Sequence, residues 1–135
     1  MIVPDASVVA LIFSEPEADP RVEQATQILT DDPEWVVPEV WRTEVLSVFR
    51  GLRRGAKLTA DDAERSLRWL QEITVVTVPT GPFLARMWEL RDNLSAYDAG
   101  YVAAAEAHQL TLVTADRRIA QAGVARCPVR LVTLS

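Results

Sequence analysis

Residues 2–13 read IVPDASVVALIF. Residues 1–4 predict a short strand, and residues 6–13 predict a buried helix that Asp5, at the junction, can cap. Proline is disfavoured in a central strand, so we expect Pro4 at the last position of its strand, where a missing N–H matters less. Asp5 then follows the carboxyl end of a strand, which is where open α/β sheets place their functional sites.

The same order of strand, acid and helix returns near the end of the chain. Residues 111–114, TLVT, predict a strand, and Asp116 opens a short helix over residues 116–122. Further strands are expected over residues 35–37, 73–78 and 130–134, and further helices over residues 19–30, 39–54, 59–71, 80–92 and 95–108. This alternation predicts an α/β fold: a short parallel β-sheet flanked by helices on both faces.

The bulk composition is that of one globular domain, which we place at residues 1–135. The chain has 135 residues, of which 49% are hydrophobic, and this suits a single core. No apolar run approaches the roughly 20 residues of a membrane span, and the N-terminus lacks the basic start of a signal peptide. Cys127 is the sole cysteine, which excludes an internal disulfide or a cysteine-rich zinc site. A cytoplasmic protein without membrane contact is expected.

The net charge of −5 argues against a protein that holds nucleic acid by its overall charge. Local basic clusters could still contact phosphates, and solvated helix faces are the alternative for the same residues. The candidates for RNA contact are Arg50, Arg53, Arg54, Lys57, Arg117 and Arg118.

Four acidic residues stand at informative positions: Asp5, Glu44, Asp98 and Asp116. Asp5 and Asp116 follow predicted strands, and capping of the next helix is the alternative role of each. Glu44 and Asp98 lie on the apolar rows of predicted helices, where an unpaired carboxylate is costly. A salt bridge to an arginine is the alternative for Glu44, and a Ser-x-x-Asp capping box is the alternative for Asp98.

Carboxylates that converge in a fold usually need a cation between them. A set of oxygen ligands without histidine or cysteine suits Mg²⁺ or Mn²⁺ and not zinc. The acids therefore indicate a divalent-metal site.

Several stretches of this chain resemble PIN-domain proteins, and in particular the VapC toxins of bacterial toxin–antitoxin pairs. They are IVPDAS (residues 2–7), PEVWRTEV (residues 38–45), LSAYDAGYVA (residues 94–103) and LVTADRR (residues 112–118). The resemblance spans nearly the whole chain, and Pro4 departs from the aliphatic residue expected there.

The resemblance implies a small α/β fold and a Mg²⁺- or Mn²⁺-dependent endoribonuclease. It gives the catalytic, metal-binding roles to Asp5, Glu44, Asp98 and Asp116, and supporting hydrogen bonds to Ser7 and Thr114. It also implies a cognate VapB-type antitoxin and a homodimer. A catalytically silent PIN-like scaffold that binds RNA or protein remains the alternative function.

The expected chemistry is attack of a metal-activated water on an RNA phosphodiester, which leaves a 5′-phosphate and a 3′-hydroxyl. A metal-free ribonuclease usually needs a general acid and a general base, often two histidines, and His108 is the only histidine. A phospho-receiver domain is disfavoured because Ala6 follows Asp5 and Lys57, the only lysine, is mid-chain. An Asp-x-Asp phosphatase is disfavoured by Ser7. The four tryptophans suit either an interface or the core.

Overall fold

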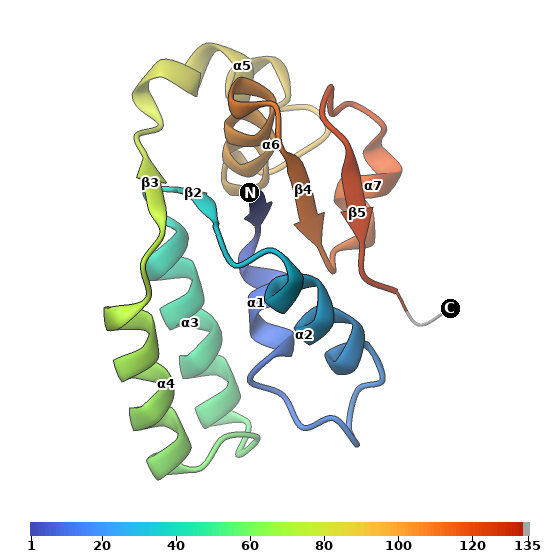
Figure 1. Cartoon of the computed structure of the whole chain (residues 1–135). Coiled ribbons are helices and arrows are strands. Elements are labelled where there is room, and N and C mark those ends of the chain that lie inside the picture. Colours follow the sequence, from blue (N-terminus) through green and yellow to red (C-terminus); the bar gives the residue numbers. More distant parts are fainter. Residues whose placement is uncertain (134–135) are drawn as a thin grey trace.

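The computed structural model describes residues 1–133, and its helices and strands alternate along the chain (Figure 1). The elements are β1 (Ile2–Pro4), α1 (Ala6–Leu11), α2 (Arg21–Asp31), β2 (Val36–Pro38), α3 (Trp41–Arg54), α4 (Ala60–Glu72), β3 (Val76–Val78), the 3₁₀ turn η1 (Gly81–Phe83), α5 (Leu84–Glu89), α6 (Ala96–His108), β4 (Thr111–Thr114), α7 (Arg117–Ala122) and β5 (Val129–Leu131).

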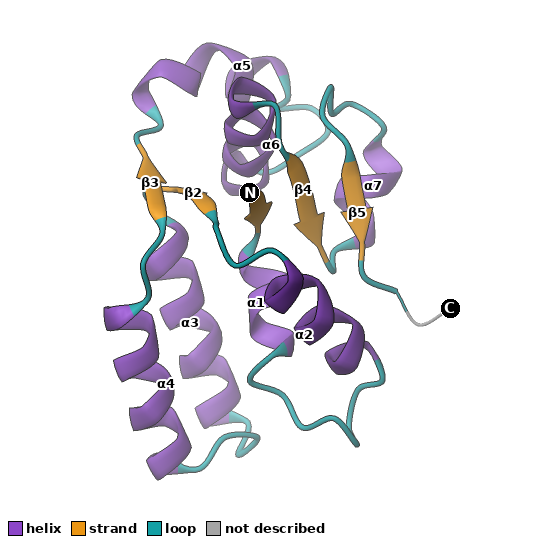
Figure 2. Ribbon diagram, in the orientation of Figure 1, coloured by secondary structure: helices purple, strands orange, loops and turns teal. Residues whose placement is uncertain are grey.

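The strands pair in parallel throughout the described residues, as the alternation predicted. One ladder has the order β1-β4-β5, and β2 pairs with β3. The two ladders meet at a parallel bridge between Ile2 and Trp35, where the Ile2 N–H donates to the Glu34 carbonyl at 3.1 Å. The strand order is therefore β3-β2-β1-β4-β5, with helices on both sides of the strand layer (Figure 2).

Pro4 takes the last position of β1, as expected, and pairs in register with Val113. The Ile2 N–H points toward β2, so the missing N–H of Pro4, two residues on, would face the same side. On that side β1 pairs only through the Ile2 bridge, so the missing N–H of Pro4 removes no hydrogen bond between strands. On the other side, the Asp5 N–H donates to the Val113 carbonyl at 3.0 Å.

The core lies between the sheet and the helices, and aromatic side chains fill the part under α3. Trp41, Val45 and Phe49 form the buried face of α3, at the spacing of one helical row. The Phe13 ring packs edge-on against Phe49 and Trp69 at centroid distances of 4.7 and 4.9 Å. Trp35, Trp41 and Trp69 pack in or against the core, whereas Trp88 is 68% exposed.

The predicted strand over residues 73–78 is shorter in the structure, where β3 begins at Val76. The Arg42 guanidinium donates to the backbone carbonyls of Leu70 and Ile73. At the end of α4 these two carbonyls therefore accept hydrogen bonds from a side chain and do not pair with a neighbouring strand. This contact outweighs the strand preference of the β-branched residues in the segment.

Other boundaries also differ from the expectation. The helix expected from residue 39 begins at Trp41, because Pro38 still pairs with Val78 in the sheet. The helix expected over residues 80–92 is divided into η1 and α5. The last strand ends at Leu131, and Leu134, which the prediction included, lies outside the described residues. None of the helices in residues 1–133 is long and apolar enough to cross a membrane.

Candidate functional site

The four acidic residues come from four elements that meet at one edge of the sheet. Asp5 directly follows β1, and Asp116 follows β4 after one intervening residue. The two strands are neighbours in the sheet, so their carboxyl ends lie together. Helix α6 leads back to the start of β4, which places its first turn, with Asp98, near this edge (Figure 1). Glu44 lies in the first turn of α3.

Asp5 is buried, with 3% of its surface exposed, and its carboxylate accepts three hydrogen bonds. The donors are the Val8 N–H at 3.1 Å, the Ser7 hydroxyl at 2.6 Å and the Thr114 hydroxyl. Burial nevertheless outweighs these bonds and raises the pKa of Asp5 from 3.8 to about 6, with a smaller contribution from the charge of Asp98. Asp5 caps α1, as predicted, and has no ion pair with any described residue.

Ser7 and Thr114 hold the two strand exits together around Asp5. Ser7 Oγ accepts from the Ala115 N–H at 2.9 Å, and Thr114 Oγ1 accepts from the Asp116 N–H at 3.0 Å. Each hydroxyl therefore donates to Asp5 while it fixes the loop that follows β4. This fixed pair is the kind of support that orients a ligand side chain.

Glu44 has a partner that the sequence analysis missed. The hydroxyl of Tyr101, on α6, donates to Glu44 Oε1 at 2.7 Å, and the Tyr101 side chain is 1% exposed. Partial burial raises the pKa of Glu44, the hydrogen bond from Tyr101 opposes this, and the charge of Asp98 adds to the increase. The predicted alternative, a salt bridge from Glu44 to an arginine, is absent from the described residues.

A signal for Tyr101 was present in the sequence, because it lies three residues after Asp98 on one face of the same helix. A buried tyrosine needs a hydrogen-bond partner for its hydroxyl, although the sequence did not identify Glu44, 57 residues away, as that partner. Burial and the charge of Glu44 both raise the pKa of Tyr101, so its hydroxyl remains a donor.

Asp98 is half-buried in the first turn of α6. Its N–H donates to the Ser95 hydroxyl at 3.1 Å, as in the predicted capping box. Partial burial raises the pKa of Asp98, the Ser95 hydrogen bond lowers it, and the negative charge of Asp116 raises it further. Asp98 also contributes to the raised pKa of both Asp5 and Glu44, so the acids lie within electrostatic reach of one another.

Asp116 differs from the other three acids because it has a cationic partner. Arg118 donates from Nε to Oδ1 at 3.1 Å and from a terminal nitrogen to Oδ2 at 2.7 Å, and its backbone N–H adds a bond of 2.9 Å. These bonds lower the pKa of Asp116. The Arg118 side chain remains 83% exposed, so it can exchange this partner for another anion.

A divalent cation fits the donor chemistry of this edge. Asp5, Glu44 and Asp98 supply only carboxylate oxygens, and burial disfavours the charge of each, which a cation would reverse. Across residues 1–133 no group of three acidic, histidine or cysteine side chains is already arranged to hold an ion.

The predicted basic contacts on α3 lie apart from the acids, whereas Arg118 binds Asp116. Arg50, Arg53 and Arg54 are exposed on the second half of α3. Arg54 is ten residues beyond Glu44, or about 15 Å along the helix at 1.5 Å per residue. Arg117 is exposed at the start of α7, beside Arg118. The structure therefore brings together the four acids, Ser7 and Thr114, and places the α3 arginines along a path that leads away from them.

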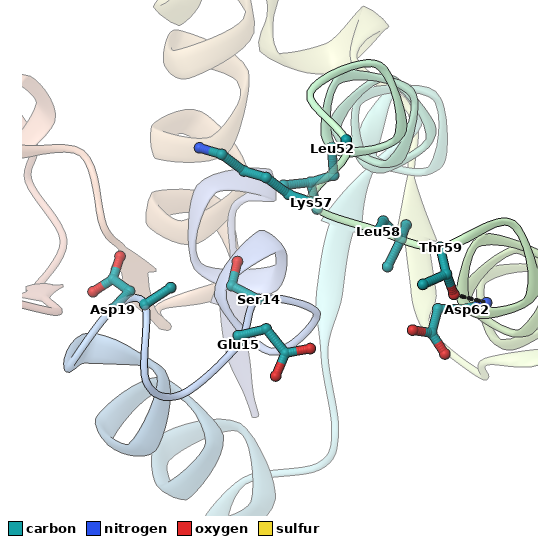
Figure 3. A pocket seen from close by; sticks show the side chains of 10 residues that line it. Ser14, Glu15, Asp19, Leu52, Lys57, Leu58, Thr59 and Asp62 are labelled. Atoms are coloured by element: carbon teal, nitrogen blue, oxygen red, sulfur yellow. Dashed lines mark hydrogen bonds between the residues drawn. The ribbon is translucent and has the colours of Figure 1, made fainter.

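Lys57 lines a separate cavity of about 490 Å³ between the α1–α2 loop and the α3–α4 turn (Figure 3). Figure 3 shows Glu15 and Asp19 on one side of this cavity and Asp62 on the other. A different cavity, of about 520 Å³, lies beside Glu44 and includes Tyr97. Of these two cavities, the second adjoins the acidic edge.

Comparisons with known proteins found a matching family and similar sequences. The family model described as the PIN domain matches residues 2–125. Ribonuclease VapC9 from Mycobacterium tuberculosis is 43% identical over 96 residues, which cover 71% of this chain and 76% of that protein. Ribonuclease VapC3 from the same organism is 35% identical over 85 residues, which cover 63% and 62%.

The solved structures include a similar fold. The crystal structure of VapC20 from M. tuberculosis, described as a Sarcin–Ricin loop cleaving toxin, matches with a TM-score of 0.66. The match covers 91% of this chain and 95% of that one at 18% sequence identity. At this identity the likeness concerns the fold.

Proposed function

This chain belongs to the PIN-domain family, within its VapC ribonuclease branch, and we propose that it is an endoribonuclease that hydrolyses RNA phosphodiesters with a divalent cation. One observation carries the proposal. Asp5, Glu44 and Asp98 come from three elements to one edge, and burial disfavours the charged form of each. A permanent arrangement of this kind costs stability unless a cation offsets it.

Mg²⁺ or Mn²⁺ is the proposed cation, held by Asp5, Glu44 and Asp98, with Asp116 as the fourth acid. When bound, such an ion lowers the pKa of a coordinated water and offsets the charge that develops on phosphate oxygens. Ser7 and Thr114 keep Asp5 in one orientation, and Tyr101 does the same for Glu44. These residues fix the acids before substrate arrives, so little reorganisation is needed during the reaction.

Arg118 has a further role in this proposal. Its guanidinium is exposed and adjoins both Asp116 and Asp98, so it can bind a phosphate oxygen near the acids. A guanidinium matches a phosphate in a bidentate manner, which makes it suited to the charge of the scissile group.

The proposed setting is a toxin–antitoxin pair, with a VapB-type antitoxin that blocks the acidic edge. A homodimer is also part of the proposal. Val76, Leu84 and Trp88, on β3 and α5, are 48%, 58% and 68% exposed, and a second copy would shield such apolar side chains from water. Sedimentation of the purified chain would show a dimer, and Trp88→Glu would make it a monomer.

Cleavage of total cellular RNA by the purified protein tests the function. The reactions contain Mn²⁺, Mg²⁺ or EDTA, and Asp5→Asn is compared with Asp92→Asn, an exposed aspartate away from the proposed ligands. We expect discrete cuts that need both a cation and Asp5, with 5′-phosphate ends. Cuts that end in a 2′,3′-cyclic phosphate would contradict direct attack by water. A protein that neither cuts RNA nor binds metal would be a scaffold.

A further inference from the structure

The cavity beside Glu44 is lined by apolar side chains and by one aromatic ring. Ala6, Val40 and Val48 line it together with Tyr97, and its volume is about 520 Å³. Tyr97 is 58% exposed although it lies next to the half-buried Asp98. An exposed aromatic ring beside a groove and one residue from a proposed catalytic acid offers a flat surface for stacking.

The rim of this groove is polar but carries no positive charge. Thr43 and Ser47 line it with hydroxyl groups, and Glu44 closes the end nearest the other acids. A phosphate would meet a carboxylate and no lysine or arginine there. A nucleobase suits the same surface, because it has two apolar faces and an edge that hydroxyl groups can hydrogen-bond.

Positive charge follows further along the same row of α3. Thr43, Ser47, Arg50 and Arg54 are spaced by four, three and four residues, which places them on one face of the helix. Both arginines are exposed. A strand that leaves the acidic edge through the groove would therefore present its next phosphates to Arg50 and Arg54.

We infer that the groove between α3 and the start of α6 is a subsite for one unpaired nucleobase of a single-stranded RNA, with the Tyr97 ring as its stacking platform. The inference rests on the proposed ribonuclease function, since it assumes that the strand passes over the four acids. Glu44 belongs to both the acidic edge and the groove, so a strand positioned for cleavage has a base at this place. Tyr97 thus acts in substrate binding and selects for unpaired RNA.

Binding measured in EDTA tests this subsite independently of cleavage. The probe is a short fluorescein-labelled single-stranded RNA of mixed sequence, and its anisotropy is followed at low ionic strength. Stacking on one aromatic side chain is worth enough that Tyr97→Ala should weaken binding by about tenfold. Tyr97→Phe keeps the ring and should bind as the wild type does. Leu67→Ala removes an exposed apolar side chain on α4, which belongs neither to the groove nor to the proposed dimer face, and serves as the control.

A set of probes with a single abasic position separates stacking from a general effect of the substitution. One abasic position should weaken binding to the wild type and leave binding to Tyr97→Ala unchanged, because the partner of that base is already missing. Equal losses for both proteins at every position would overturn the inference. Unchanged RNA affinity of Tyr97→Ala, or no RNA binding by the wild type, would also overturn it. If Tyr97→Ala lost only antitoxin binding, the groove would be a protein-binding site.

Discussion

Asp5 combines three hydrogen-bond donors with a pKa above its ordinary range. Donors to a carboxylate favour its charged form, yet burial at 3% exposure outweighs them. The residue is therefore held in one orientation and lacks a positive partner. A ligand that brings positive charge would gain from both properties.

The pH dependence of stability follows from this. Between pH 4 and pH 6 the native state binds the Asp5 proton more tightly than the unfolded chain, so the Asp5 contribution to stability falls as the pH rises across this window. The shift of about two units corresponds to on the order of 3 kcal/mol. Asp5→Asn cannot titrate, so the unfolding free energy of the wild type in EDTA should fall relative to this variant over that window.

Urea denaturation at a series of pH values measures the difference. Above pH 6, Mn²⁺ should raise the unfolding free energy of the wild type again, because a cation favours the charged carboxylate. The unfolding free energy of the variant should stay unchanged. If the difference in unfolding free energy between the two proteins stays constant from pH 4 to pH 7, the charged form of Asp5 does not destabilise the protein.

Tyr101 acts on the site through Glu44. Tyr101→Phe keeps the buried ring and removes the 2.7 Å hydrogen bond, so Glu44 is no longer fixed. Loss of such a supporting partner typically weakens metal binding by 10-fold or more, and we expect about a tenfold loss of Mn²⁺ affinity with the fold retained. Calorimetry on Tyr101→Phe, Glu44→Gln and the double variant checks the coupling. Additive losses would mean that Tyr101 does not work through Glu44.

At the scale of elements, α6 links the capping, acidic and supporting residues of the site. Ser95 caps the helix, Asp98 lies one turn later, and Tyr101 lies one further turn along the same face. The direction of α6, opposite to β4, brings this face to the strand exits (Figure 1). A single short helix therefore sets the position of two acids, one directly and one through a hydroxyl.

Helix α3 carries arginines on two different rows, which allows a matched comparison. Arg50 continues the row of Thr43 and Ser47, whereas Arg53 is turned about 80° from Thr43 and about 120° from Ser47 at 3.6 residues per turn. Arg50→Ala should lower the salt dependence of RNA binding by about one phosphate contact. Arg53→Ala removes the same charge and should change it less. If the salt dependence of RNA binding were the same for the wild type and Arg50→Ala, this row of α3 would be ordinary solvated surface.

At the scale of the whole molecule, the alternation of strands and helices predicted the parallel sheet, and local capping residues predicted where several helices begin. Asp5 and Ser95 each cap the helix that follows, because their signals depend on neighbouring residues only. The start of β3 was not predictable in this way, since Arg42 donates from 31 residues away to the Ile73 carbonyl, which precedes β3. Tertiary contacts of this length leave no local pattern.

The candidate site could also be predicted only in part from the sequence. The four acids could be singled out because an acid is unusual at a strand exit or on an apolar helical row. The Tyr101–Glu44 bond joins residues 57 positions apart, and the Arg118–Asp116 pair was hidden because Arg118 could equally face solvent. The basic cluster of α3 looked like one unit in the sequence, but the structure spreads it along the helix and places Lys57 beside a separate cavity.

The claim that the four strand-exit and helix acids form a divalent-metal site is tested most directly by calorimetric titration of Mn²⁺ into the wild type, Asp98→Asn and Asp92→Asn. Asp98 is half-buried among the acids, whereas Asp92 is exposed and close in sequence. Asp92→Asn should bind Mn²⁺ as the wild type does, and Asp98→Asn should lose most of its affinity with an unchanged circular dichroism spectrum. Equal Mn²⁺ affinity in all three proteins would contradict the claim.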